Sequence, residues 1–156
     1  ASFVDVKNSH FNVNNSDLMN VTFENAIFST ASFENANLEN ANFSNVIINA
    51  AHNGNGKYSA GAKFAGANLT NADFSNAKIA WGNFNGANLT NSDFTDFTAV
   101  IAEFNGADVT DANFQNATFL FADFTNANFE AALVADMLSF FTKENSPDFL
   151  ENNESK

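Results

Sequence analysis

Residues 62–121 read AKFAG-ANLTN-ADFSN-AKIAW-GNFNG-ANLTN-SDFTD-FTAVI-AEFNG-ADVTD-ANFQN-ATFLF. Alanine, a small polar residue and then phenylalanine or leucine recur here every five residues. A period of five matches neither the turn of a helix, about 3.6 residues, nor the two-residue alternation of a flat strand. A fixed short repeat is typical of a solenoid, in which each unit buries its apolar side only by stacking on its neighbours. The sequence therefore predicts a repeat architecture.

Each pentad has a large apolar residue that we call its centre, as at Phe64, Leu69 and Phe74. Alanine usually stands two residues before the centre. Because positions two apart on an extended segment point the same way, we expect alanine and centre both to face inward. The other three positions are Asn, Asp, Ser, Thr or Gly, which tolerate the turn conformations needed to bend the chain at each unit.

The length of one coil follows from three apolar pairs in outward positions. Twenty residues separate each pair from the next in the series Ala80-Trp81, Val100-Ile101 and Leu120-Phe121. This spacing indicates four pentads per coil and a roughly square cross-section. About six coils, at about 4.8 Å per stacked rung, predict a rod about 30 Å long.

The pentads are interrupted between Ile48 and Phe64. Sixteen residues separate these two centres, which equals three pentads and one inserted residue. Threaded in this way, the chain has a small loop excursion near residues 50–58, where Asn-Gly pairs favour a tight reversal. The same threading predicts an inward column Phe3, Phe23, Phe43, Phe64, Phe84, Phe104, Phe124 and another that runs Leu18, Leu38, Tyr58, Ile79.

The stretch of ten residues 67–76, ANLTN-ADFSN, carries the pattern A-[DN]-[LF]-x-x twice, and the chain resembles the pentapeptide-repeat proteins over about residues 1–136. The resemblance implies an all-β solenoid, a right-handed quadrilateral β-helix with type II or type IV turns at its corners. We expect this β-helix to occupy residues 1–130.

The C-terminal end departs from the pentad pattern. Apolar residues at Leu133, Met137, Phe140 and Phe141 follow helical spacing, which predicts a capping α-helix over residues 131–142. Such a helix would cover the apolar interior and the unpaired backbone groups of the last rung. Residues 143–156 are expected to form a flexible polar tail.

Composition limits the functions open to this chain. Its formal net charge of −12 argues against direct binding to nucleic acid or to an anionic membrane, since phosphate contacts need basic side chains. It has no Cys, and the two histidines, His10 and His52, stand in separate positions, so we expect no metal site. No nucleophile, zinc-binding or phosphate-loop motif is present; residues 52–57 have the wrong spacing for the last of these. We therefore expect no enzyme activity and no cofactor.

The outward apolar pairs are the candidate protein interface: Ala80, Trp81, Val100, Ile101, Leu120 and Phe121. Contiguous apolar patches on soluble proteins mark contacts, and self-association is the first candidate. The alternative is that part of the tail, at Phe149-Leu150, covers the stripe from within the same chain. Ile27 and Ile47 form a smaller apolar stripe near the other end of the repeat.

The leading functional hypothesis is a non-catalytic structural or protein-binding module, because the repeat is complete and no catalytic constellation exists. The alternative is an acidic DNA mimic that binds type II topoisomerase, as the quinolone-resistance group of this family does. The acidic residues, however, are scattered over several faces rather than gathered in one track. Two minor alternatives are ice binding by the column Thr70, Thr90, Thr110 and end-to-end assembly through open rung edges. The identity of the partner and the compartment are left open.

Overall fold

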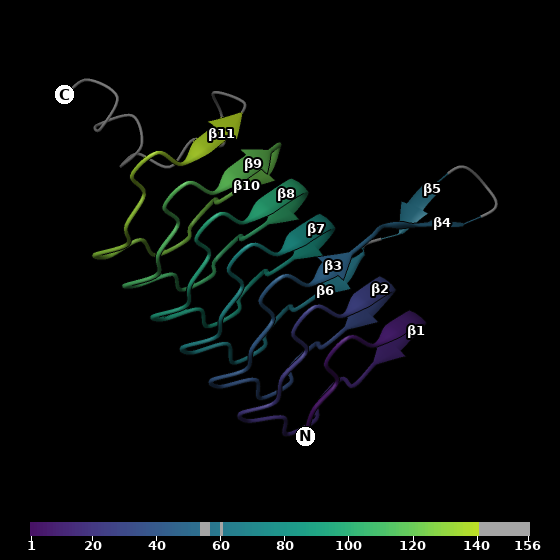
Figure 1. Ribbon diagram of the computed structural model, residues 1–156. Helices are drawn as coiled ribbons and strands as arrows, with labels where there is room; N and C mark the ends of the chain where they lie inside the picture. Colours follow the sequence, from purple (N-terminus) through teal and green to yellow (C-terminus); the bar gives the residue numbers. More distant parts are fainter. Residues whose placement is uncertain (54–56, 60, 141–156) are drawn as a thin grey trace.

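The computed structural model describes residues 1–53, 57–59 and 61–140, which wind into an all-β solenoid of the right-handed type (Figure 1). Its strands are β1 (Lys7–Asn12), β2 (Ile27–Ser32), β3 (Ile47–Ile48), β4 (Ala51–Asn53), β5 (Lys57–Ser59), β6 (Ala62–Lys63), β7 (Lys78–Asn83), β8 (Thr98–Glu103), β9 (Thr118–Leu120), β10 (Ala122–Asp123) and β11 (Leu138–Phe140). All except β4 and β5 belong to one parallel sheet along a single side of the solenoid. We call the outer surface of that sheet the strand face.

Parallel pairing with a step of twenty residues confirms the predicted four pentads per coil. Lys7 pairs with Ile27, and Ile27 pairs with Ile47. Isolated bridges repeat this step on the other sides of the coil, for example from Ser2 to Thr22 and on to Asn42. Each outward position therefore stacks on its equivalents in the coils above and below.

Left-handed residues turn the chain at the corners. Seventeen non-glycine residues have φ between 54 and 60°, most of them Asn or Asp two positions after a centre. Asn25 is an example: its φ is 59°, and the Ala26 N–H donates to the Phe23 carbonyl at 2.9 Å. This combination is that of a type II turn, which requires positive φ at its third residue. Asn and Asp reach the left-handed region at lower cost than other side chains, which explains why these positions are rich in them.

Asparagine also forms ladders that run along the solenoid. The Asn40 amide donates to Asn20 Oδ1 at 3.2 Å, and the Asn71 amide donates to Asn40 Oδ1 at 3.0 Å. Just before many centres, an Asn or Asp side chain accepts from the backbone N–H two residues on, as Asp73 Oδ1 does from the Ser75 N–H at 2.8 Å. The high Asn content thus satisfies the polar groups that the bent backbone leaves outside its own hydrogen bonds.

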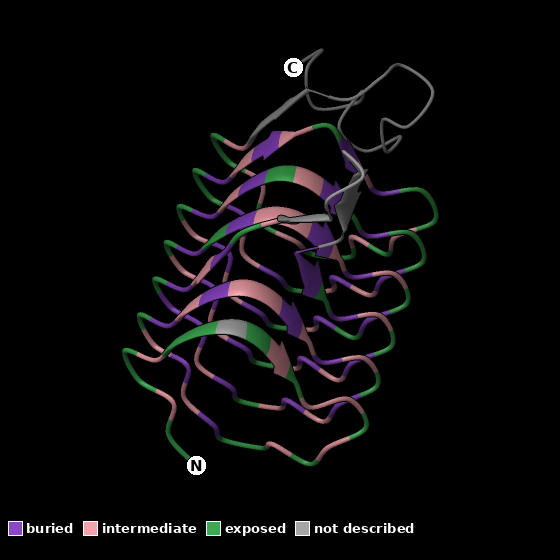
Figure 2. Cartoon of the chain, turned by 90° about the vertical axis from the view of Figure 1, so that its right-hand side faces the viewer, coloured by how far each residue is buried: buried purple, intermediate pink, exposed green. Residues whose placement is uncertain are grey.

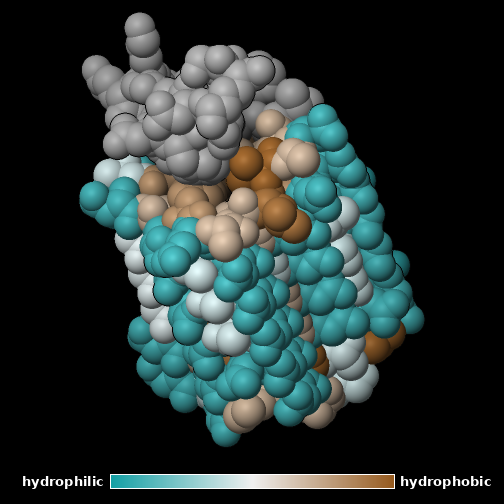
Figure 3. Space-filling model, turned by 90° about the vertical axis from the view of Figure 1, so that its left-hand side faces the viewer, coloured by the Kyte–Doolittle hydropathy of each residue, from teal (hydrophilic) through white to brown (hydrophobic). Residues whose placement is uncertain are grey.

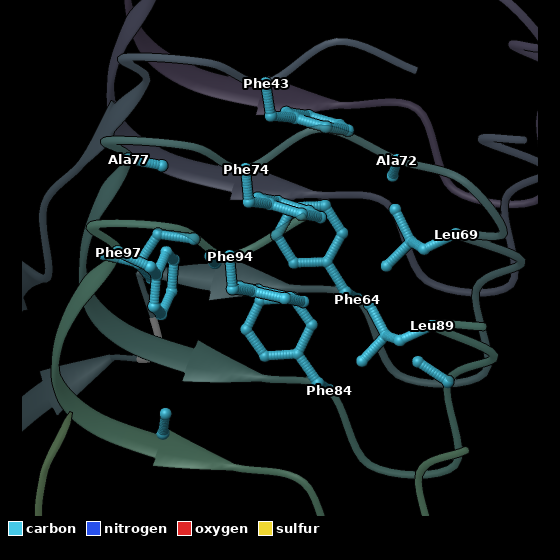
Figure 4. Packing of buried hydrophobic residues seen from close by; sticks show 14 of the residues in the cluster. Phe43, Phe64, Leu69, Ala72, Phe74, Ala77, Phe84, Leu89, Phe94 and Phe97 are labelled. Atoms are coloured by element: carbon cyan, nitrogen blue, oxygen red, sulfur yellow. The ribbon is translucent and has the colours of Figure 1, made fainter. Parts of the chain in front are cut away.

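Phenylalanine rings fill the interior in two stacked columns (Figure 4). Phe43, Phe74 and Phe94 stack in one column with centroids 4.8 and 4.9 Å apart, and Phe64 stacks on Phe84 at 4.9 Å in the other. Rings of different columns meet edge to face, as Phe64 and Phe74 do at 5.5 Å and 88°. Figure 2 shows the resulting alternation of buried residues with more exposed ones along the coils between the two ends of the solenoid. At one rung Phe97 and Ala99 exchange their usual places, and both are buried as the pattern predicted.

The predicted path between Ile48 and Phe64 is wrong. Asn42 pairs with Asp73, a step of thirty-one residues, so eleven residues leave the coil rather than one. Phe64 consequently stacks on Phe33 at 4.9 Å and not on Phe43, two pentads away on the opposite side of the coil. The predicted column that joined Phe23 and Phe43 to Phe64 is therefore two columns, and Leu38 continues to Leu69 rather than to Tyr58.

The described residues of this excursion, 51–53 and 57–59, form the two strands of a hairpin that projects from the body of the solenoid (Figure 1). Strands β4 and β5 pair antiparallel, and Tyr58, predicted to be a core residue, pairs there with His52. The two legs of the hairpin meet closely at Gly61. A Cβ at Gly61 would lie 2.5 Å from the Asn49 carbonyl oxygen, so glycine is needed where the chain re-enters the coil.

The predicted capping helix is wrong over residues 131–140, and the residues that the structure describes contain no helix. Leu133 instead bridges to Asn113, Ala131 and Asp136 take left-handed turns, and β11 pairs with β9. The pentad phase continues through Phe129 and Val134, and the added rung pairs with the backbone of the rung before it, as the Leu133 N–H does with the Ala112 carbonyl at 2.8 Å. Residues 141–142 and the predicted tail, 143–156, lie outside the described residues.

Replacing Phe94 by alanine tests the stacked core. The Phe94 ring is fully buried and lies 4.9 Å from the Phe74, Phe97 and Phe114 ring centroids. We expect Phe94→Ala to lower the free energy of unfolding by about 3–5 kcal/mol, measured by urea denaturation, because it opens a cavity between rigid rungs. The control Gln115→Ala changes an exposed side chain and should stay within about 0.5 kcal/mol. Equal effects of the two substitutions would contradict this account of the core.

Candidate functional site

The six residues of the predicted interface lie together on the strand face. Ala80 and Trp81 belong to β7, Val100 and Ile101 to β8, and Leu120 ends β9, with Phe121 directly after it. Trp81 and Ile101 are Cα partners across β7 and β8. We call this set of six residues the apolar stripe.

The members of the apolar stripe differ in exposure, and Phe121 is the most exposed. Ala80, Trp81, Ile101 and Leu120 are half-buried, whereas Val100 is 43% exposed and Phe121, at the C-terminal end, is 66% exposed. The equivalent positions at the N-terminal end are polar: His10 pairs with Thr30, and His10 Nδ1 lies 2.9 Å from Thr30 Oγ1. The outward column that contains His10, Thr30, Trp81 and Ile101 therefore changes from polar to apolar along the solenoid. The repeat itself does not require this change.

Phe121 has a backbone conformation that differs from that of the equivalent residues in other coils. Its φ is 60°, whereas in the pairs β1–β2 and β7–β8 the equivalent residues His10, Thr30, Trp81 and Ile101 lie inside extended strands. Positive φ is a genuine outlier for a bulky side chain and costs roughly 1–2 kcal/mol. Left-handed turns elsewhere in the repeat use Asn, Asp or Gly at nearly every such site. An aromatic residue that is both strained and exposed is a candidate for function rather than stability.

A shallow hollow joins the apolar stripe to the smaller one. It measures about 240 Å³ and is lined by Ile47, Ile48, Asn49, Lys78, Ile79, Ala80, Thr98 and Val100. Ile27 and Ile47 are Cα partners on the same strand face, so the two stripes are parts of one surface. Sequence reasoning missed this connection because it placed the excursion incorrectly; the signal was the apolar residue before the centres at positions 28 and 48.

Charge is divided between the strand face and the rest of the surface. Every lysine of the described residues lies in a strand, and Lys7, Lys63 and Lys78 are exposed on the strand face. Of the Asp and Glu residues in the described ranges, only Glu103 and Asp123 lie in these strands. The strand face is therefore the least acidic side of an acidic protein, a second feature that the sequence analysis missed.

The side of the molecule away from the strand face is mostly hydrophilic (Figure 3). Hydrophobic residues gather on it mainly near the C-terminal end. Acidic residues there do not form a continuous track: Asp73 stacks on Asp93, but the next rungs on either side carry Asn42 and Asn113. A column from Asp17 to Asp108 is likewise interrupted by asparagines at positions 37, 68 and 88.

The threonine column is engaged in local hydrogen bonds. The hydroxyls of Thr70, Thr90 and Thr110 each donate to the Asn or Asp side chain two residues earlier, at 2.6–2.8 Å. These bonds hold the hydroxyls in a regular array along the rungs. Ice binding by this column stays a prediction.

Metal-binding geometry is not found within the described ranges. No three His, Asp or Glu side chains of that part of the chain come together as a metal site requires. His52 lies in the hairpin, away from His10 in β1. The described residues also include no helix that could cross a membrane.

Comparison with known proteins agrees with this geometry. A family model for pentapeptide repeats matches residues 15–52, 60–96 and 102–132 in eight copies. The curated proteins contain no match. Among solved structures, the chain is similar to HetL, a pentapeptide repeat protein involved in heterocyst differentiation regulation in the cyanobacterium Nostoc sp. strain PCC 7120. The identity is 22% and the TM-score 0.50, over 86% of this chain and 63% of HetL, so the chain spans less than two thirds of HetL's length.

Two further solved structures are more distant. A trypsin-treated form of QnrB1, a plasmid-mediated fluoroquinolone resistance protein, is 14% identical over 99% of this chain and 98% of its own, with a TM-score of 0.35. A pentapeptide repeat protein from the thylakoid lumen of Arabidopsis thaliana is 17% identical over 92% of this chain and 73% of its own, with a TM-score of 0.22. Likeness at this level carries no argument about function.

Replacing Phe121 by asparagine tests whether the aromatic residue is kept at the expense of stability. Asparagine accepts the left-handed conformation, so Phe121→Asn should raise the free energy of unfolding by roughly 1 kcal/mol in urea denaturation. The control Val100→Asn removes an exposed apolar side chain from β8, where the backbone is extended, and should give no gain. A loss of stability in Phe121→Asn as large as that in the control would contradict the strain assigned to this residue.

Proposed function

Because the chain belongs to the pentapeptide-repeat family, we propose that it is a non-catalytic protein-binding module whose strand face docks a protein partner. The observation that carries this proposal is the apolar stripe, centred on Trp81, Ile101 and Phe121, in outward positions whose equivalents at the N-terminal end, His10 and Thr30, are polar. Aromatic and aliphatic residues gathered at one place on a soluble protein are typical of a contact surface.

The solenoid suits this role because its surface is rigid before a partner arrives. Backbone hydrogen bonds of 2.7–3.0 Å join the coils around the stripe, for example from the Phe84 N–H to the Glu103 carbonyl and from the Thr98 N–H to the Ala77 carbonyl. Little conformational freedom is then lost when the stripe is covered, so most of the free energy of apolar burial is available for binding.

The least acidic face also favours a protein partner over other ligands. With a net charge of −12, the chain repels phosphate-bearing nucleic acids and anionic membranes. A protein partner can instead bury the stripe without bringing negative charge close to the acidic faces. A second copy of the chain, as a dimer or by end-to-end association, is the first partner to test.

Introducing charge into the stripe tests the proposed function. The full chain with Trp81→Glu and Ile101→Glu should lose, by at least about tenfold, any partner retained in a pull-down and any self-association seen by light scattering, because a buried unpaired charge is strongly unfavourable. The matched control, Thr90→Glu with Thr110→Glu, adds the same charge on another face and should retain both. Equal behaviour of the two double variants would exclude the strand face as the docking surface.

A second candidate, the acidic DNA mimic, is favoured by the net charge of −12. A mimic of duplex phosphates needs negative charges along one track, and the columns that contain Asp73 and Asp93 carry neutral asparagine on adjacent rungs. This pattern makes the strand face the better candidate.

A supercoiling assay separates the two candidates. We expect the full chain at micromolar concentration neither to inhibit DNA gyrase nor to protect it from a fluoroquinolone, because its acidic columns are interrupted. A known topoisomerase-protecting protein serves as the positive control. Inhibition or protection that persists in the Trp81→Glu, Ile101→Glu variant would support the mimic instead.

A further inference from the structure

Two carboxylates border the apolar stripe on one side. Glu103 in β8 and Asp123 in β10 each stand two residues after a member of the stripe, and they are Cα partners on neighbouring rungs. Glu103 accepts from the Asn85 amide at 2.7 Å and Asp123 from the Thr125 hydroxyl at 2.6 Å, and no basic side chain of the described residues forms an ion pair with either. Covering the stripe therefore draws two unneutralised negative charges away from water.

The opposite border of the apolar stripe is electrically balanced. Thr98 and Thr118 are Cα partners there, and Lys78 takes the equivalent position in β7. Lys78 and Asp96 line a second hollow, of about 310 Å³, so the carboxylate of Asp96 offsets the charge of the lysine. The stripe is thus negative along one border and neutral along the other.

The spacing of the rungs favours a helix as the element that covers the stripe. Trp81, Ile101 and Phe121 lie on successive coils (Figure 1), so they span about 10 Å along the solenoid. On an α-helix, residues i, i+4 and i+7 share a face at about 0, 6 and 10.5 Å along the axis, which keeps each within about 1.5 Å of a rung. Side chains on one face of an extended segment recur every 6.8 Å or so, which carries the third about 4 Å past the last rung.

An added β-strand finds no free edge at the stripe. Strand β7 pairs with β3 and β6 on one side and with β8 on the other, and β8 pairs in turn with β9 and β10. The backbone groups of these strands are thus used within the solenoid, and a partner must bind them through side chains. A helix meets this requirement because its own backbone groups bond internally.

We infer that the strand face binds a basic amphipathic α-helix of another protein, laid along the solenoid axis with its apolar residues on the stripe. Lys or Arg residues three or four apart on one flank of that helix pair with Glu103 and Asp123, whose spacing is close to that of such neighbours on a helix. The net charge of −12 also accelerates association with a basic partner. A second copy of this acidic chain offers no helix among its described residues. The inference rests on the proposed function and names the chemical class of its partner.

Trp81, the only tryptophan of the chain, reports on the binding of peptides that lack tryptophan. The probe is a helical peptide of about 18 residues with blocked ends, leucine at i, i+4 and i+7, and lysine along one flank. Adding it to the full chain should shift the emission of Trp81 to shorter wavelength, and the shift should saturate. A peptide with the same residues shuffled to remove the apolar face, and one with glutamate in place of lysine, should each bind at least about tenfold more weakly. Equal affinity of either peptide would overturn the inference.

Neutralising the two carboxylates tests the charged border. Glu103→Gln with Asp123→Asn keeps a side-chain acceptor oxygen at both positions and removes two charges. The dissociation constant of the basic helical peptide should rise about tenfold. The matched control, Asp73→Asn with Asp93→Asn, removes two charges from neighbouring rungs of another face and should raise it less than about twofold. Equal effects of the two double variants would mean that net charge alone attracts the peptide, and the inference would be wrong.

Other occupants of the stripe give different results. A peptide held extended by proline that binds as tightly as the helical one would overturn the inference. So would dimerisation of the parent that the Trp81→Glu, Ile101→Glu variant abolishes, because a second copy would then cover the stripe. Emission of Trp81 that no peptide alters at millimolar concentration would overturn it as well.

The inference and the proposed function fail separately. If the Trp81→Glu, Ile101→Glu variant loses its partner but the basic helical peptide does not bind the parent, the strand face docks a protein through another kind of element, and only the inference is wrong. If the peptide binds while that variant keeps its partner, the proposed function is wrong although the stripe accepts a basic helix.

Discussion

The stacking of each coil on the next at the spacing of neighbouring β-strands is the constraint on which the rest of the structure depends. Parallel strands lie about 4.8 Å apart, and the stacked phenylalanine centroids lie 4.6–5.1 Å apart, so ring stacking and backbone pairing are satisfied by the same translation. The same spacing between coils therefore suits the stacked rings of the core, the backbone hydrogen bonds and the asparagine ladders. A residue that suits its position in one coil suits the equivalent position in the next.

Because of this constraint, the outward residues of successive coils stack in columns. The composition of these columns can vary and so can serve a function. Inward positions have almost no freedom, since Phe84, Phe94 and Phe104 are all fully buried between neighbouring rungs. Outward positions are constrained only at the left-handed corners. Elsewhere a column can carry threonine, asparagine, lysine or apolar residues without disturbing the coil. The strand face makes most use of this freedom, because its extended strands need no left-handed residue.

Departures from the repeat gather on that face. The hairpin β4–β5 leaves the coil there, Phe121 adopts an unfavourable φ there, and Lys78 borders an apolar hollow there. Natural sequences break local rules mainly where another requirement outweighs stability. Away from the strand face, the described surface departs from the repeat mainly at its C-terminal end, where Leu133 is exposed in a column that carries Asn or Asp on the four preceding rungs. A contact role is better supported on the strand face, because three successive rungs there carry apolar residues in outward positions.

The sequence by itself determined the solenoid, the inward pairs of alanine and phenylalanine, the four-pentad coil and the outward position of Trp81, Ile101 and Phe121. Each follows from local periodicity, because every pentad repeats the same contacts. Only the tertiary structure decided which side Phe64 occupies and that residues 131–140 form another rung. An excursion of one residue and one of eleven leave the same phase within the pentad, and both present phenylalanine to a stacked neighbour. The choice between these two excursions depends on long-range pairing between coils, which a local period of five residues does not reveal.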